Sequence, residues 1–150
     1  MCLRKYKETR NNHHKEDGYC IAYKVIRKNN FSIFCQKETF IYHIGENIPD
    51  ATFHPDIYAF YLNKNYVEGE RVDYGLHLFL DKSIAKWLIS WNEKHIMNSS
   101  ENMKIIKVYY KPEDVIAYGR SNTFHSFDDK EVEKSVVVRK LTIKSLDPIE

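Results

Sequence analysis

Basic side chains flank the segments of this sequence whose structure is easiest to predict. Lysine and arginine bind phosphate through charge-assisted hydrogen bonds, so a fold that gathered these side chains could hold a phosphate-bearing ligand. Arg139 and Lys140 are neighbours in one predicted strand, and for them a structural role is the alternative. Their side chains point to opposite faces of the strand, so one can point outward while the other packs its aliphatic stem against the protein. Both interpretations stay open for this set, which comprises Lys24, Arg71, Arg120, Arg139 and Lys140.

His77 is the histidine that could most readily take part in chemistry. It lies between two leucines of a predicted strand, where an imidazole is either a stacking or acid–base group or a half-buried structural residue. The seven histidines lack H-x-x-x-H and H-E-x-x-H spacings, and the three cysteines lack C-x-x-C spacing. The five glycines are isolated, so neither common nucleotide-binding loop is present. We therefore expect no metal site and no bound cofactor.

Composition and charge narrow the class of protein. The 150 residues include 23 Lys and Arg against 21 Asp and Glu, a net charge of +2, whereas nucleic-acid-binding domains normally carry a clear basic excess. No apolar run approaches the roughly 20 residues of a membrane span, and the N-terminal segment lacks the apolar stretch of a signal peptide. An odd number of cysteines fits reduced thiols. These features predict a soluble, cytoplasmic protein with no membrane partner and no extended nucleic-acid surface.

Hydrophobic patterning predicts the elements that position these side chains. The clearest is a helix over 82–97, with Asp81 as N-cap and a single face that carries Ile84, Trp87, Leu88, Trp91 and His95. Around Pro55 a short helix, a strand and an ordered loop are about equally consistent with the sequence. Runs of strand-forming residues predict strands over 19–27, 31–35, 39–44, 74–80, 104–110, 115–118 and 135–144.

The order of these elements predicts an α+β fold. One long amphipathic helix cannot cover both faces of a parallel sheet, so we expect a mixed, mostly antiparallel sheet packed against the helix at about 82–97. Residues 1–18 are polar and poor in apolar side chains, which predicts a flexible arm. Residues 19–146 have the length of a single globular domain.

Several short motifs occur together in this chain, among them Tyr23-Lys24-Val25, Tyr42-x-x-Gly45 and Gly75-Leu76-His77-x-Phe79. In this order they resemble a group of small domains of unknown function found in phages, prophages and large DNA viruses. The resemblance spans about residues 19–143. It implies a shared fold and an accessory protein of phage or viral type, in the cytoplasm of the host cell if viral, and it carries no assigned chemistry.

A second resemblance involves the segment 75–79 together with Ser83 and Ala85, which is similar to a G-[IL]-[YH]-F-x-x-x-x-x-x-A segment of ADP-ribosyltransferase-like folds. It implies NAD as the cofactor and His77 as the ring that stacks on the nicotinamide. Glu131 or Glu133 would then be the carboxylate that polarises a ribose hydroxyl as charge develops in the transition state. The structural alternative for these two glutamates is a solvated, mixed-charge turn.

Two classes of function follow. In the first, the protein is a phage- or viral-type accessory protein that binds a host protein or a small phosphorylated ligand. The alternative is a divergent ADP-ribosyltransferase-like enzyme with His77, Glu131 and Glu133 as catalytic residues. That family usually has His or Arg where this chain has Tyr23-Lys24, and this difference favours the binder. The predicted ligand-binding residues are Tyr23, Lys24, Gly75, His77, Phe79 and Arg139.

Overall fold

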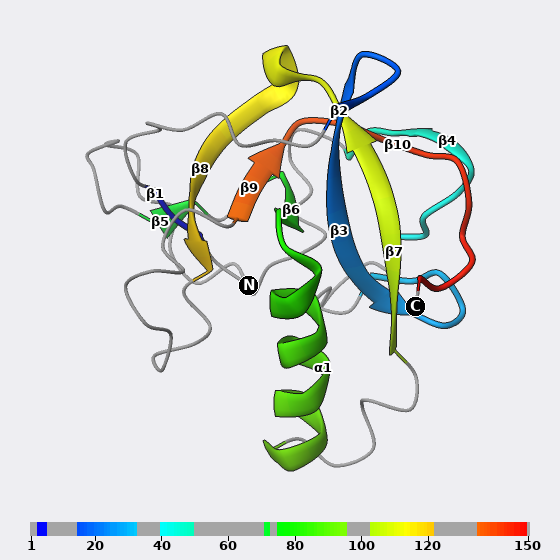
Figure 1. Ribbon diagram of the computed structural model, residues 1–150, viewed down its shortest axis with the longest axis vertical. Helices are drawn as coiled ribbons and strands as arrows, with labels where there is room; N and C mark the ends of the chain where they lie inside the picture. Colours follow the sequence, from blue (N-terminus) through cyan, green and yellow to red (C-terminus); the bar gives the residue numbers. More distant parts are fainter. Residues whose placement is uncertain are drawn as a thin grey trace.

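The computed structural model describes residues 3–5, 15–32, 40–49, 71–72, 75–95, 103–121 and 135–149. Within these ranges a ten-stranded sheet packs against a single α-helix (Figure 1). The elements are β1 (Leu3–Lys5), β2 (Lys15–Glu16), β3 (Tyr19–Arg27), β4 (Gly45–Asn47), β5 (Arg71–Val72), β6 (Leu76–Phe79), α1 (Lys82–His95), β7 (Met103–Tyr110), the 3-10 helix η2 (Pro112–Asp114), β8 (Val115–Ser121), β9 (Ser135–Val138) and β10 (Leu141–Ile143).

The strands of the sheet follow the order β4-β10-β7-β3-β6-β9-β8-β1-β5, and β2 pairs with β3 beside this path. Each pairing between the described strands is antiparallel. The longest ladder joins β3 and β7 in continuous register from Cys20–Tyr110 to Arg27–Met103. The predicted α+β class with a mostly antiparallel sheet is therefore confirmed.

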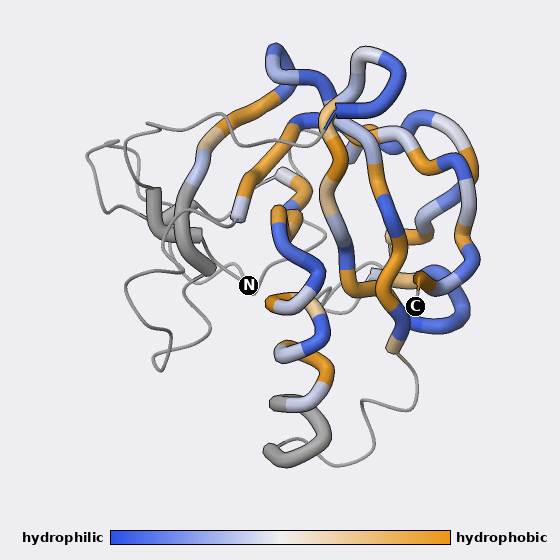
Figure 2. Tube along the Cα trace, in the orientation of Figure 1, coloured by the Kyte–Doolittle hydropathy of each residue, from blue (hydrophilic) through white to orange (hydrophobic). Residues whose placement is uncertain are grey.

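Helix α1 begins where the sequence predicts. The Asp81 carboxylate accepts hydrogen bonds from the Ser83 amide at 2.8 Å and from the Ser83 hydroxyl at 2.8 Å, as an N-cap should. The helix buries Ile84 and Leu88 in a cluster with the apolar side chains of β3, β6 and β7. Apolar residues recur along α1 between hydrophilic ones (Figure 2). The helix is described as far as His95, and residues 96–97 of the prediction lie outside the described residues.

A second core lies on the other face of the sheet. Alternate residues of each strand point to opposite faces, so the neighbours of the residues under α1 face away from the helix. On that side Ala22, Ile26, Ile106 and Val108 of the central ladder are fully buried together with Tyr42. Where α1 packs, both faces of the central strands are therefore covered, which explains the consecutive apolar residues Val25-Ile26 and Ile105-Ile106.

Two strand predictions need correction. The single strand predicted over 135–144 is two strands, since β9 lies between β6 and β8 whereas β10 lies between β4 and β7. The chain changes neighbours at Arg139, whose amide and guanidinium both bind Asp114. Of the strand predicted over 39–44 the structure describes residues 40–44, which contain an isolated bridge between Phe31 and Ile41, and β4 begins at Gly45 instead.

The predicted arm also differs, because two of its segments belong to the sheet. Leu3–Lys5 forms β1 between β5 and β8, and Lys15–Glu16 forms β2 on β3. Backbone hydrogen bonds between strands do not require apolar side chains, so the polar composition of this segment did not reveal the two strands. At the other end Ile149 packs in the cluster under α1 and donates its amide to the Ile105 carbonyl, so the folded unit extends beyond residue 146. The elements predicted around Pro55 and over 33–35 lie outside the described residues.

Candidate functional site

Two of the predicted ligand-binding residues form a cross-strand pair. Tyr23 of β3 lies opposite Phe79 of β6 in the register of the two strands. Both rings belong to the cluster under α1, where Phe79 is buried and Tyr23 is half-buried. Their rings therefore contribute to the core between sheet and helix.

Lys24 and His77 come together where β3 and β6 meet. Lys24 is only 4% exposed, and its Nζ donates a hydrogen bond of 2.8 Å to the His77 carbonyl oxygen. The same Nζ lies 5.5 Å from the centroid of the buried Tyr42 ring. His77 itself is 5% exposed. Because it alternates with Leu76 and Leu78, its imidazole lies on the opposite face from theirs, so Lys24 contacts the backbone of His77 and not its ring.

Gly75 is required by its backbone conformation and by the packing of the side chains around it, and not by close approach of a ligand. Its φ is +81°, a conformation that L side chains rarely adopt. A Cβ added there would lie 2.7 Å from Val137 Cγ1 and 2.8 Å from Ile116 Cδ1. The space beside the glycine is therefore filled by the protein's own side chains.

The remaining predicted residues do not join this group as a site. The Arg139 guanidinium forms an ion pair of 2.7 Å with Asp114, whose side chain is 3% exposed. This pair fastens the β9–β10 connection to η2. Glu131 and Glu133 lie outside the described residues. The described members of the predicted set are thus largely engaged in packing and in internal bonds.

A second group of charged and aromatic side chains lies elsewhere on the sheet, where the lysines are at least partly exposed and the Tyr109 ring is buried. Helix α1 covers β3 and β7 near Val25 and Ile105. Lys107 and Tyr109 follow Ile105 by two and four positions along β7, so they lie on the same face of the sheet, beyond the start of the helix. There the structure brings five side chains together, and we call them the Lys–Tyr face: Tyr19, Lys107, Tyr109, Lys111 and Lys144.

Three ammonium groups lie over the two rings of this face. Lys107 Nζ is 5.3 Å and Lys144 Nζ is 4.2 Å from the centroid of the same Tyr109 ring. Lys111 Nζ is 5.3 Å from the centroid of Tyr19. The two rings meet edge to face with centroids 6.4 Å apart. Such distances place each cation in reach of the negative face of a ring.

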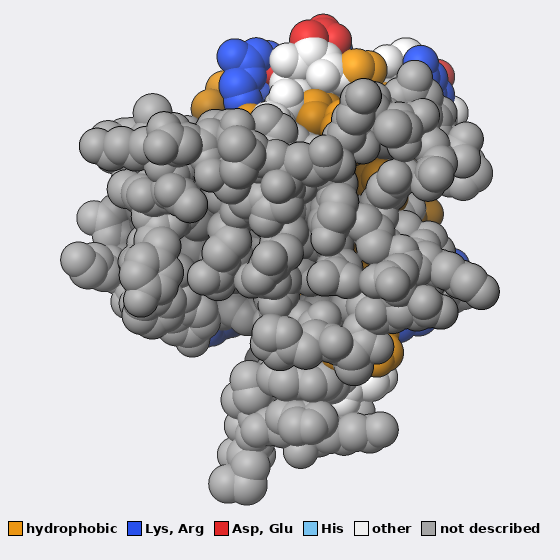
Figure 3. All heavy atoms as spheres, turned by 90° about the vertical axis from the view of Figure 1, so that its left-hand side faces the viewer, with side chains coloured by type: hydrophobic (Ala, Val, Ile, Leu, Met, Phe, Trp, Pro, Cys, Tyr) orange, Lys and Arg blue, Asp and Glu red, His pale blue; other side chains and the backbone are white. Residues whose placement is uncertain are grey.

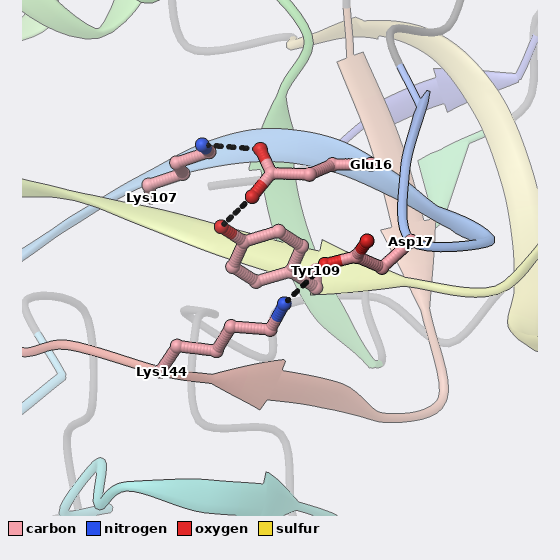
Figure 4. A network of polar contacts seen from close by, with 5 residues as sticks. All are labelled: Glu16, Asp17, Lys107, Tyr109 and Lys144. Carbon is pink, nitrogen blue, oxygen red and sulfur yellow. Dashed lines mark hydrogen bonds and ion pairs between the residues drawn. The ribbon is translucent and has the colours of Figure 1, made fainter.

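The β2–β3 hairpin brings two carboxylates to the edge of the Lys–Tyr face (Figure 4). Glu16 accepts a hydrogen bond from Lys107 at 2.8 Å and one from the Tyr109 hydroxyl at 3.2 Å. Asp17 is farther from its partner, 3.6 Å from Lys144. Lys111 forms no ion pair within the described part of the chain. The three lysines therefore differ in how strongly internal acids hold them.

The hydrogen bond between Glu16 and Lys107 changes the acidity of both groups. It lowers the pKa of the Glu16 carboxyl below its usual range and raises the pKa of the Lys107 ammonium. Both side chains therefore carry full charge at neutral pH.

In a view turned by 90°, described basic, acidic and apolar side chains gather at the end of the molecule where the β2–β3 hairpin lies (Figure 3).

The sequence contained part of the signal for this face. Lys107 and Tyr109 stand two residues apart in β7, so the strand presents both on one side, whereas Lys111 follows the end of β7 at Tyr110. Tyr19 and Lys144 come from strand β3 and from the residue after β10, and only the strand order brings them to β7. The basic residues named from the sequence did not include any of the three lysines of this face.

Comparison of the chain with protein-family models, with curated proteins and with solved structures found no match. Among the described residues, no helix is both long and apolar enough to cross a membrane. The same residues contain no cluster of three or more His, Cys, Asp or Glu side chains placed to hold a metal ion.

Proposed function

We propose that this protein acts as a binding protein and that its Lys–Tyr face receives the phosphate group of a small phosphorylated ligand. The observation that carries the proposal is the placement of two ammonium groups, Lys107 and Lys144, over the same Tyr109 ring. Phosphate offers several charged acceptor oxygens and binds best where more than one donor converges. The two lysines lie on either side of the Tyr109 ring (Figure 4) and supply two charged donors near it.

The internal acids leave room for such a ligand. Lys144 and Asp17 are separated by 3.6 Å and their side chains are 45% and 79% exposed. Exposed ion pairs of this kind contribute only about 0–1 kcal/mol, so a phosphate can replace the Asp17 carboxylate at small cost. Glu16 is held more tightly and keeps a negative charge at the edge of the face. That charge repels a long polyanion more than a single phosphate group, which favours a small ligand.

The resemblance to small phage and viral domains supports the wider proposal that this is an accessory protein of that type. A host protein with a phosphorylated or acidic side chain would present the same chemistry to the face. The alternative, an NAD-dependent transferase, receives less support, because the space beside Gly75 is occupied by Val137 and Ile116.

Calorimetric titration with inorganic pyrophosphate at low ionic strength tests the proposal. We expect saturable binding that Lys144→Gln and Lys111→Gln each weaken by about five-fold, since each removes roughly 1 kcal/mol of charge-assisted contact. Lys86→Gln is the matched control, because Lys86 is an exposed lysine on α1 outside the face. Equal affinities for the parent protein and all three variants would refute the proposed site.

A separate assay distinguishes the enzyme alternative. The parent protein is incubated with NAD and host lysate, and released nicotinamide is measured by mass spectrometry. We expect no release above the level of His77→Ala. Release by the parent that this variant abolishes, in a protein that remains folded, would favour the transferase instead.

A further inference from the structure

Lys111 is the lysine of the Lys–Tyr face that no described acid holds. It is exposed, and within the part of the chain that the structure describes it forms no ion pair. Lys107 and Lys144, in contrast, face Glu16 at 2.8 Å and Asp17 at 3.6 Å. The two carboxylates of the face therefore belong to the other two lysines, and the ammonium group of Lys111 is available to a ligand.

Lys111 and Lys144 lie beside different rings of the face. Lys111 directly follows β7, and its Nζ is 5.3 Å from the centroid of Tyr19. Lys144 directly follows β10, and its Nζ is 4.2 Å from the centroid of Tyr109. The two centroids are 6.4 Å apart. Because β10 and β7 are antiparallel, the chain at Lys144 runs back toward Lys107, whereas Lys111 follows the opposite end of β7.

This separation bears on the kind of ligand that the face can hold. A phosphate group carries its oxygens around one phosphorus atom, so its charge-assisted hydrogen bonds reach only donors that surround one point. Lys107 and Lys144 flank Tyr109 and are the donors proposed for that group. Lys111 lies over the neighbouring, half-buried Tyr19 and is placed to meet a second anionic group of the same ligand.

The β2–β3 hairpin provides an internal example of two linked anionic groups on this face. Glu16 and Asp17 are adjacent in the chain, and their carboxylates approach Lys107 and Lys144 (Figure 4). A ligand with two anionic groups would use the same chemistry. One group would replace the exposed Asp17 carboxylate at Lys144, and the other would meet Lys111 without displacing any described acid.

We propose that Lys111 forms a second anionic subsite of the Lys–Tyr face, so that the ligand is a small molecule with two anionic groups on a short spacer. A phosphate group binds at Lys144, and a second phosphate or a carboxylate binds at Lys111. This inference rests on the proposed phosphate site and specifies the class of its ligand. Binding of the first group makes binding of the second intramolecular, which raises the affinity without any further contact.

Calorimetric titrations of the full chain at pH 8 and low ionic strength test the second subsite. Propane-1,3-bisphosphonate carries two anionic groups on a short spacer, and methylphosphonate carries one. We expect one bisphosphonate to bind per chain, at least about ten-fold more tightly than methylphosphonate. Lys111→Gln should weaken bisphosphonate binding by about ten-fold and methylphosphonate binding by less than about two-fold, whereas Lys144→Gln should weaken both.

Lys140→Gln is the matched control for net charge. Lys140 is a neighbouring lysine after β9 whose ammonium group lies 3.4 Å from Glu46, and its replacement should change either affinity by less than about two-fold. A loss as large as that in Lys111→Gln would attribute the effect to net charge and overturn the subsite. Equal affinities for the two ligands, or an equal loss for both in Lys111→Gln, would overturn the subsite but leave the phosphate site at Lys144. Absence of binding by either ligand would overturn both.

Discussion

Replacement of Gly75 by alanine tests whether this glycine is required by packing or is free for a ligand. At φ +81° an L-residue carries a backbone cost of about 1–2 kcal/mol. The added Cβ would also meet Val137 Cγ1 at 2.7 Å, Ile116 Cδ1 at 2.8 Å and the Val138 carbonyl at 3.1 Å. Overpacking of this kind costs about 1–3 kcal/mol. We therefore expect Gly75→Ala to lower the free energy of unfolding by about 2–5 kcal/mol.

The chain offers a closely matched control for this substitution. Gly18 has φ +82°, and an added Cβ there would have no atom within 4 Å. Gly18→Ala should therefore cost only the backbone part, about 1–2 kcal/mol. Any effect of alanine on the unfolded chain is similar in both variants, so the difference between them isolates the contact of the new methyl group with Val137 and Ile116.

Urea denaturation followed by circular dichroism measures both variants. A shift of the midpoint without a change in slope reports stability alone. Val137→Ala in the Gly75→Ala background should restore part of the loss, so the double variant should be more stable than the two separate losses predict. If Gly75→Ala destabilised the protein no more than Gly18→Ala, the packing argument would be refuted and the space beside Gly75 would be open for a ligand.

The internal bonds described above lead to four further predictions. Glu16→Gln should tighten pyrophosphate binding in calorimetry, because it removes the carboxylate that holds Lys107; a weaker affinity would contradict this. The Lys107 bond lowers the pKa of Glu16, so its stabilising effect is present above the ordinary glutamate pKa and is lost as the pH falls through the lowered value. The unfolding free energies of the parent and Glu16→Gln should therefore converge in acid, and a constant difference would be inconsistent with the pair. Lys24→Ala should cost about 2–5 kcal/mol in urea denaturation, whereas Lys24→Met, which keeps the volume, should cost clearly less. Asp114→Asn should lower the free energy of unfolding by about 1–3 kcal/mol because it removes a charged partner of Arg139, and Arg139→Gln tests the other side of the ion pair. Unchanged stability in both variants would show that this ion pair does not stabilise the fold.

Much of the fold could be predicted because its elements are locally encoded. Asp81 followed by apolar residues three and four apart defines a helix whatever surrounds it, and the structure begins α1 at Lys82. The strand-forming run that begins at Tyr19 likewise becomes the central strand β3. The break at Arg139 could not be predicted, because an unbroken run of strand-forming residues does not reveal a change of neighbours in the sheet.

The residues of the candidate site also divide into those that local sequence could place and those that depend on neighbours in the sheet. Sequence alone determined that Lys107 and Tyr109 share one side of the strand predicted over 104–110, because that depends only on the two-residue period of an extended chain. The partners of these residues depended on tertiary structure. Glu16 and Lys107 are 91 positions apart and meet only because β2 pairs with β3 and β3 with β7. Long-range register likewise decided that Val137 occupies the space beside Gly75, since β6 must lie beside β9 for that contact to exist.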